Sequence, residues 1–310
     1  MTRTTDAKHQ PPAPPSVVVT GAGGHLGSHL VPALAQAGYV VRGLDVVDPP
    51  AAWPAGCCFV RADLLCLEEV RAAVQGAALV VHCASIHPWK PYTDEQYLDV
   101  NVKGTWQLYT AVAAEGIERV VLTSSIAAAG YPGLAASPLR EDDEFAVTDL
   151  YSLTKRTQED IARLHAARGQ VRTVALRPPT FVPLPPLETG FRLTGAFAVV
   201  EDMVTAHVAA VEAMLGRPGP DAPSLAAFEA IYTANALPYR AEDAALLGPG
   251  DDLRPLVRKH WPEAHDWLIA RGYQGSWLPG VYDLSKARRL LGWQPALNFE
   301  QWFAEARSTG

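Results

Sequence analysis

The chain has 310 residues, of which 48% are hydrophobic and 19% are charged, and its net charge at pH 7 is −7. These values are ordinary for a globular protein with a sizeable core. The diffuse negative charge argues against a nucleic-acid-binding surface, which needs a basic stripe. No apolar run approaches the roughly 20 residues of a membrane span, so we expect neither nucleic acid nor a membrane among the partners.

The N-terminal segment and the cysteines indicate the compartment. Residues 1–15 are polar and then proline-rich, without the apolar centre of a secretory signal, so we expect a disordered tail there. The four cysteines show no metal-like CxxC spacing, and we interpret them as reduced thiols. The sequence therefore predicts a cytoplasmic protein without a metal site.

Short apolar runs alternate with helical patterns along the first 177 residues. The first run is β-branched and ends in a glycine cluster, and an apolar helical pattern then runs to Gly38. Such alternation predicts an α/β fold, a doubly wound parallel sheet covered by helices on both faces. Further strands are predicted at 39–44, 57–60, 79–82, 120–123 and 171–176, and helices at 67–74, 94–115 and 149–168.

The pattern changes after Arg177. Residues 178–195 are predicted to form a Pro/Gly-rich loop, and from Pro238 we expect loops and short helices. We therefore predict a dinucleotide-binding domain over 16–178 and a smaller substrate lobe over 179–310, some of whose elements return to the main sheet. The regular elements expected in this part are a strand at 228–233 and helices at 201–215, 285–291 and 300–307.

The segment Thr20-Gly-Ala-Gly-Gly-His-Leu-Gly27 lies between a predicted strand and a predicted helix. Gly21 allows a tight turn, Gly24 a close approach to a pyrophosphate, and Gly27 close packing of the helix on the strand. A pyrophosphate would then sit on the free N–H groups at the helix N-terminus. We expect cofactor contacts from Gly21, Gly23, Gly24, His25, Leu26 and Gly27.

Two acids follow the next two strands. Asp45 lies 18 residues after Gly27, where a carboxylate accepts from ribose hydroxyls and repels a 2′-phosphate, so NAD is favoured over NADP. Asp48 is an alternative for this role. Asp63 can accept from an adenine amino group, or it can equally be a helix N-cap.

Tyr151 and Lys155 are four residues apart on a predicted helix and therefore share a face. A nearby ammonium lowers the pKa of a phenol, so we interpret the pair as an acid/base device. Ser124 and Ser125 end the fifth predicted strand, where ligands bind in such sheets. Asn101, on the preceding helix, is expected to orient this network, or else to be a capping residue.

Together these motifs resemble the extended short-chain dehydrogenase/reductase family, which contains the NAD-dependent epimerases and dehydratases. The resemblance runs from Val17 to about Pro295. It rests on the glycine segment at 20–27, Asp45, AspLeu at 63–64, HisCysAlaSer at 82–85, AsnValLysGlyThr at 101–105, ThrSerSer at 123–125, TyrSerLeuThrLys at 151–155, ArgProPro at 177–179, and the segment 283–295.

The resemblance implies roles for single residues. Ser125, rather than Ser124, binds the substrate oxygen, Tyr151 exchanges its proton, and Lys155 holds the nicotinamide ribose and tunes Tyr151. Cys83 is implied to be a packed residue, not a nucleophile. The remaining cofactor contacts implied by the resemblance are Asp63, Leu64, Cys83, Ala84, Ser85, Lys155 and Pro178.

Departures from the family pattern narrow the substrate. No Asp-Glu pair follows Ser125, which argues against dehydration, and the short segment after Arg177 argues against a clamp for nucleotide sugars. The compact chain is most similar to uronate dehydrogenases, so a small, sugar-like substrate is expected. Ser85, His87 and Trp89 follow the fourth strand and are expected to border it; alternatively, Trp89 packs in the core and His87 caps a turn.

Three functions remain open at this level. The first is an NAD-dependent dehydrogenase or reductase acting on a secondary alcohol or ketone. The second is a nucleotide-sugar epimerase with tightly bound NAD, and the third is a non-catalytic NAD(P)-binding sensor. The resemblance also implies a homodimer formed through the helices that hold Asn101 and Tyr151.

Overall fold

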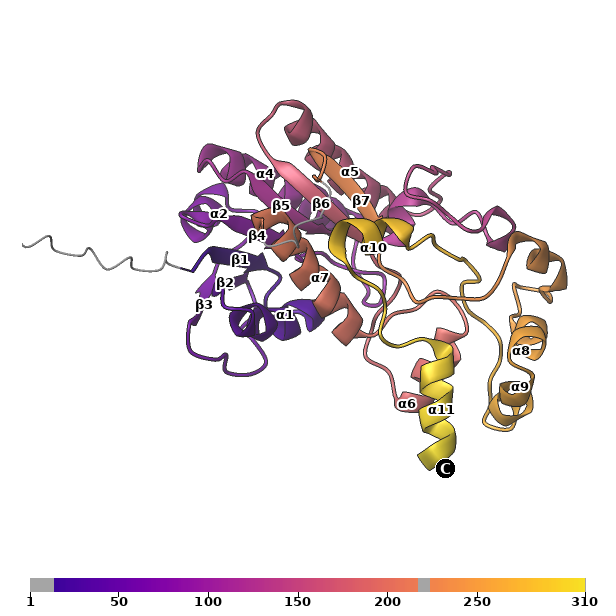
Figure 1. Cartoon of the computed structure of the whole chain (residues 1–310). Coiled ribbons are helices and arrows are strands. Elements are labelled where there is room, and N and C mark those ends of the chain that lie inside the picture. The colour runs from indigo at the N-terminus through magenta and orange to yellow at the C-terminus, as the bar shows by residue number, and fades with distance from the viewer. Residues whose placement is uncertain (1–13, 217–223, 310) are drawn as a thin grey trace, which may run out of the picture.

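The computed structural model describes residues 14–216 and 224–309, so the predicted tail lies almost wholly outside the described residues. At its centre is a seven-stranded, all-parallel sheet, as the alternation predicted (Figure 1). The strands are β1 (Ser16–Thr20), β2 (Val40–Asp45), β3 (Cys57–Arg61), β4 (Leu79–His82), β5 (Arg119–Thr123), β6 (Arg172–Arg177) and β7 (Phe228–Tyr232).

The strand order is β3-β2-β1-β4-β5-β6-β7, so the chain winds outward in both directions from β1 and β4. These two strands are paired through Thr20 and His82 at their carboxyl ends. Ligands of open α/β sheets bind in the crevice outside such a reversal point, because the loops on either side of it diverge. The glycine segment after β1 and the His87 loop after β4 both leave from this point.

Helices cover both faces of the sheet (Figure 1). One face packs against α1 (His25–Gln36), α7 (Val200–Leu215) and α10 (Ser285–Leu291), and the other against α2 (Leu67–Val74), α4 (Gly104–Ala114) and α5 (Leu150–Ala167). The alternation of side chains along β1 divides the core in the same way. Val17 and Val19 belong to the first layer and Val18 to the second, as the period of two along a strand requires.

The helix predicted over 94–115 is interrupted. It consists of α3 (Asp94–Tyr97), a π-helical segment η1 (Leu98–Lys103) and α4. Thr93 and Gln96 form a capping box at its start, in which each side chain binds the other residue's backbone N–H. The π segment carries Asn101, which is fully buried.

The C-terminal part divides between the sheet and a separate group of helices. β7 extends the main sheet, and α7 and α10 cover one of its faces, whereas the remaining helices of this part pack on an aromatic core that contains Phe197, Phe299 and Trp302. The prediction of a loop over 178–195 is wrong in part, because α6 begins there on Pro186, a residue suited to a first helical turn. The helices of this group are α6 (Pro186–Leu193), α8 (Arg254–His260), α9 (Pro262–Ile269) and α11 (Phe299–Thr309). Three short 3₁₀ helices complete the described part of the chain. Two of them follow β5, η2 (Ile126–Ala129) and η3 (Leu134–Ala136), and the third, η4 (Ala241–Leu246), follows β7.

No helix within the described residues is both long enough and apolar enough to cross a membrane.

Candidate active site

One cavity of about 820 Å³ follows the carboxyl ends of the central strands. We call its two parts the glycine end, around Gly21, Gly24 and Asp45, and the tyrosine end, around Ser125 and Tyr151. Most residues singled out from the sequence line this cavity, and Gly23, Asp48, Asn101 and Lys155 do not. Those that line it are Gly21, Gly24, His25, Leu26, Gly27, Asp45, Asp63, Leu64, Cys83, Ala84, Ser85, His87, Trp89, Ser125, Tyr151 and Pro178.

The turn at the glycine end has no room for side chains. Gly21 has a φ of +69°, and a Cβ on it would lie 2.6 Å from the backbone nitrogen of Ala84. A Cβ on Gly27 would lie 2.2 Å from the carbonyl oxygen of Gly21. The N–H of Gly24 donates to that same carbonyl at 3.0 Å, so the turn closes on itself and the N-terminus of α1 opens into the cavity. This is the cradle that a pyrophosphate needs.

Asp45 stands beside this turn. Its carboxylate accepts from the N–H of Gly23 at 2.9 Å and from that of Val47 at 3.1 Å, while it still borders the cavity. Asp48, the alternative, lies outside the cavity and pairs with Arg61 at 2.6 Å. The glycine turn and Asp45 therefore fit a dinucleotide, with the acid placed for ribose hydroxyls.

Asp63 also borders the glycine end. Its carboxylate accepts from the N–H of Leu65 at 2.9 Å, and the N-cap of α2 is Cys66, so the interpretation of Asp63 as that cap is wrong. Leu64 is buried beside it. The pair therefore forms part of the cavity wall.

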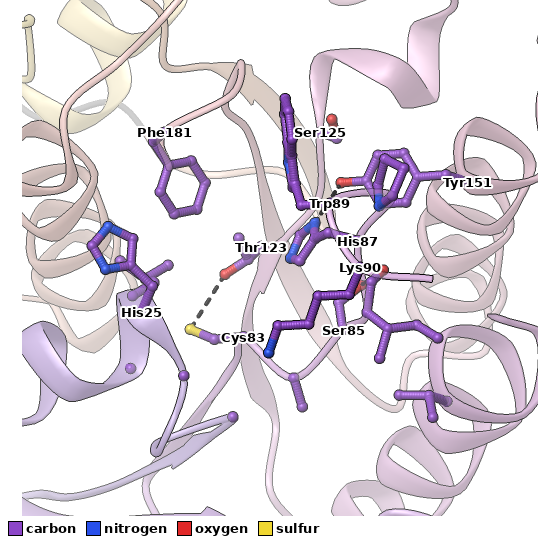
Figure 2. Close-up of a pocket in the computed structure, with 18 of the residues that line it drawn as sticks. His25, Cys83, Ser85, His87, Trp89, Lys90, Thr123, Ser125, Tyr151 and Phe181 are labelled. Carbon is purple, nitrogen blue, oxygen red and sulfur yellow. Dashed lines mark hydrogen bonds between the residues drawn. The ribbon is translucent and has the colours of Figure 1, made fainter. Parts of the chain in front are cut away.

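Tyr151 lies at the tyrosine end, at the start of α5 (Figure 2). Its hydroxyl is 3.1 Å from Nδ1 of His87, and Lys155 Nζ lies 5.8 Å from the centroid of its ring. Lys155 instead donates to the carbonyl of Thr123 at 3.0 Å. The prediction that Lys155 lowers the pKa of Tyr151 is therefore wrong. Burial raises the pKa of Tyr151 above its usual value, and only a hydrogen bond with Ser125 acts against this rise.

Burial also suppresses the charges around Tyr151. It lowers the pKa of His87 to about 3, with the ammonium of Lys155 adding to the effect. It lowers the pKa of Lys155 to about 7, against a smaller opposing effect of Cys83 and Glu159. His87 is therefore neutral near pH 7 and Lys155 is poised to gain or lose a proton there.

Ser124 and Ser125 point in different directions. The hydroxyl of Ser124 donates to buried Glu159 at 2.6 Å, whereas Ser125 faces Tyr151 across the cavity. The implied choice of Ser125 over Ser124 agrees with this geometry. Sequence reasoning did not single out Glu159, although it continues the spacing of Tyr151 and Lys155 by four more residues along one helix face.

Glu159 forms a buried ion pair with Arg177. Two bonds, of 2.9 and 2.8 Å, join the guanidinium to the carboxylate, and the side chains are 2% and 1% exposed. Burial raises the pKa of Glu159, but Arg177 and Ser124 together outweigh it and leave the pKa below its usual value. We call Glu159 and Arg177 the floor of the tyrosine end, because this ion pair lies behind Ser124 and outside the cavity lining.

Asn101 acts on the loop that carries His87. Its Oδ1 accepts from the N–H of Ile86 at 2.8 Å and from the hydroxyl of Ser85 at 3.0 Å, and its Nδ2 donates to the carbonyl of Ile86 at 3.1 Å and to Thr154. Asn101 therefore holds the loop from behind rather than lining the cavity. It is not the capping residue of the alternative interpretation.

Two further alternatives from the sequence are wrong. Trp89 is 55% exposed and borders the cavity, so it does not pack in the core. The ring of His87 binds Tyr151 instead of capping a turn. Cys83 also lines the cavity, and burial raises the pKa of its thiol to about 12, which makes it a poor nucleophile. Within 14–216 and 224–309, no three His, Cys, Asp or Glu side chains are placed to hold a metal ion.

The sequence matches one protein-family model and is similar to several known proteins. The NAD dependent epimerase/dehydratase family model matches residues 17–183. Short-chain dehydrogenase/reductase family 42E member 1 of Mus musculus is 28% identical over 276 residues, 78% of this chain and 66% of that protein. Cinnamoyl-CoA reductase 1 of Arabidopsis thaliana is 32% identical over 241 residues, 65% of this chain and 68% of that protein. The chain spans about two thirds of the length of these relatives.

Solved structures share the fold over nearly the whole chain. Uronate dehydrogenase from Agrobacterium tumefaciens is 26% identical, with a TM-score of 0.67 over 96% of this chain and 90% of that one.

Proposed function

This chain belongs to the NAD-dependent epimerase/dehydratase family, and on that premise we propose that it is a dehydrogenase or reductase of the short-chain type. Its reaction interconverts a secondary alcohol and a ketone, with Tyr151 as the acid/base. One observation carries this proposal: Tyr151 and Ser125 border the same cavity as the glycine turn and Asp45. A substrate oxygen held at the tyrosine end would therefore lie within reach of a nicotinamide that extends from the glycine end.

The proposed cofactor is NAD, held by the glycine turn, Asp45 and the wall from Asp63 to Leu64. When bound, it supplies the hydride acceptor or donor of the reaction. Asp45 supports NAD over NADP, because a carboxylate that already accepts from Gly23 and Val47 would repel a 2′-phosphate.

Each residue at the tyrosine end has a proposed task. Tyr151 takes the proton of the substrate hydroxyl during oxidation and returns it to the carbonyl oxygen during reduction. Ser125 binds the same oxygen. Lys155 lies behind the cavity lining, so to bind the ribose its ammonium has to exchange its bond with the Thr123 carbonyl for one with the ribose. His87 binds the Tyr151 hydroxyl, and Asn101 positions the loop on which His87 lies.

The two other functions have less support. An epimerase would use the same Tyr151 and Ser125 and would keep NAD bound, but it needs a grip on a nucleotide sugar. A binding protein without turnover has no need for a tyrosine and a serine aimed at one point. The similarity to uronate dehydrogenase supports the sugar-like substrate predicted from the sequence. The side chains that line the tyrosine end instead favour an apolar ketone or alcohol, as argued in the next subsection.

We also propose a cytoplasmic homodimer. Four apolar side chains on η1, α4 and α5 are 39–48% exposed, and a partner that packs on these helices would take them out of water. They are Leu98, Trp106, Leu153 and Leu164. The division into a dinucleotide-binding domain over 16–178 and a substrate lobe over 179–310 stays a prediction.

Tyr151→Phe tests the proposed function. Losing the hydroxyl removes the proton carrier, so kcat should fall by about 10²–10⁴-fold while NAD affinity stays within about threefold. The measurement is absorbance at 340 nm together with NAD titration by fluorescence. Tyr92→Phe, which removes the hydroxyl of another tyrosine in the cavity lining, is the matched control. Unchanged turnover in Tyr151→Phe would exclude the mechanism.

A further inference from the structure

Resting on the proposed function, we infer that the tyrosine end binds a neutral, largely apolar carbonyl compound, or the matching secondary alcohol. A free sugar, a uronate and a nucleotide sugar are each poorly matched to this part of the cavity. Three observations carry the inference: the nature of its walls, the state of its polar groups, and the placement of nearby cations.

The walls of the tyrosine end are apolar and aromatic. Figure 2 shows Phe181 across the cavity from Tyr151, with Trp89 between them in this view. Trp89 is 55% exposed, and the ring of Phe181 stacks on His25 at 6.4 Å. An exposed indole that borders a cavity gains most from an apolar ligand that takes it out of water. Other apolar residues of the cavity lining are Ile86, Pro88, Ile126, Pro179, Val182 and Pro183.

Three polar side chains of the cavity lining are engaged with the protein itself. Ser85 donates to Asn101 at 3.0 Å, Ser124 donates to Glu159 at 2.6 Å, and Asp149 caps α5 by accepting from Ser152 at 2.8 Å. A sugar presents several hydroxyls, and each one buried without a partner costs free energy. Ser125 and Tyr151 suffice for the single oxygen of a ketone, whereas a polyhydroxylated ring would also need the polar side chains farther along the lining, Lys90, Tyr92, Tyr131 and Thr180.

The described arginines that would bind an anionic substrate do not line the cavity. No arginine is among the described residues that line the cavity, and Lys90 is the one lysine in that lining. Arg177 is buried against Glu159, and Arg192 lies 3.9 Å from the ring centroid of Trp277. Carboxylates and diphosphates are commonly bound by two-pronged arginine contacts, so a uronate or a nucleotide sugar lacks its usual partner here.

A substrate panel tests this inference. Benzylacetone with NADH, and its alcohol with NAD, are compared at 340 nm with glucose, glucuronate and UDP-galactose under the same conditions. Reduction places hydride on the carbonyl carbon and the proton of Tyr151 on its oxygen, so NADH is consumed one for one. We expect kcat/KM for benzylacetone to exceed that for glucuronate by at least about 100-fold.

Variants of the walls separate contact from folding. Trp89→Ala and Phe181→Ala should each raise KM for benzylacetone by about tenfold and leave kcat within about threefold, because they remove binding and not chemistry. Leu246→Ala, which shortens an exposed leucine outside the cavity, is the matched control and should leave KM unchanged. Thermal unfolding of all three variants verifies the fold.

The outcomes are distinguishable. Turnover confined to sugars, uronates or nucleotide sugars would overturn this inference and leave the proposed function standing. An unchanged KM in both wall variants would overturn it as well. Absence of turnover with every compound, with NAD still bound, would overturn the proposed function itself.

Discussion

The glycine end and the tyrosine end are built in different ways. At the glycine end the backbone makes the site, and Gly21 and Gly27 are required because a Cβ would meet other backbone atoms at 2.2–2.6 Å. At the tyrosine end the site is made by side chains that follow different strands, and buried contacts such as that of Asn101 with Ile86 hold them in place. A local sequence motif therefore identifies the cofactor, whereas the substrate depends on contacts between distant segments.

The largest expected effect concerns the floor of the tyrosine end. Glu159→Gln leaves the buried guanidinium of Arg177 without a counter-charge, so the free energy of unfolding should fall by about 3–5 kcal/mol. Urea unfolding measures this change. Asp160→Asn, one residue along the helix and 63% exposed, should cost less than about 1 kcal/mol. Equal losses of unfolding free energy in the two variants would show that the buried pair of Glu159 and Arg177 stabilises the protein no more than the exposed Asp160 does.

The next effect concerns the glycine end. Gly27→Ala places a methyl group against the Gly21 carbonyl and forces α1 away from β1, so NAD should bind about 100-fold more weakly, or about 2.7 kcal/mol. Fluorescence titration with NAD measures the affinity. Ser28→Ala, the neighbouring position outside the cavity lining, is the control and should bind normally. If Gly27→Ala bound NAD with unchanged affinity, the close backbone packing at the glycine end would not be required for NAD binding.

A smaller effect tests the choice of cofactor. Asp45→Asn removes the charge that opposes a 2′-phosphate, so NAD affinity should fall about tenfold, or about 1.4 kcal/mol, while NADP affinity rises. Both dissociation constants are measured on the same preparation. Asp48→Asn removes a neighbouring carboxylate that pairs with Arg61 outside the cavity, and it should change neither constant. A preference for NADP already present in the unaltered protein would contradict the role of Asp45.

The smallest expected effect concerns His207, which contacts Thr123 of the cavity lining. His207 binds the Thr123 hydroxyl at 2.8 Å, and burial lowers the pKa of His207 from 6.5 to about 4. The unfolded chain takes up this proton first as pH falls, so the contribution of His207 to the free energy of unfolding should decrease by about 1 kcal/mol between pH 6.5 and 5.5, in addition to the contributions of buried histidines such as His87. His207→Gln should lose this contribution, and the exposed His29→Gln should keep it. Identical pH dependence in His207→Gln and the unaltered protein would exclude His207 as the source.

Local signals predicted most of the fold. Strands and helices of the sheet were predictable because each has its own apolar period, and the glycine segment because only glycine fits its turn. The helix α6 was missed because the prolines around it indicate a loop. The partnership of Glu159 with Arg177 and the raised pKa of Tyr151 were missed because both depend on burial by distant segments. The residues near the reacting oxygen were thus predictable individually, but their electrostatics were not.

The π-helical segment Leu98–Lys103 makes the site sensitive to the length of the chain. A π turn holds one residue more than an α turn, so α3 and α4 are rotated relative to each other by about the 100° of one residue. That rotation lets Asn101 reach Ile86 while Leu108 and Val112 of α4 stay in the core. Substitutions that preserve the residue count leave this arrangement possible, whereas deletion of one residue would restore a regular helix and make the two requirements incompatible. In this helix the site depends on the number of residues as well as on the identity of Asn101.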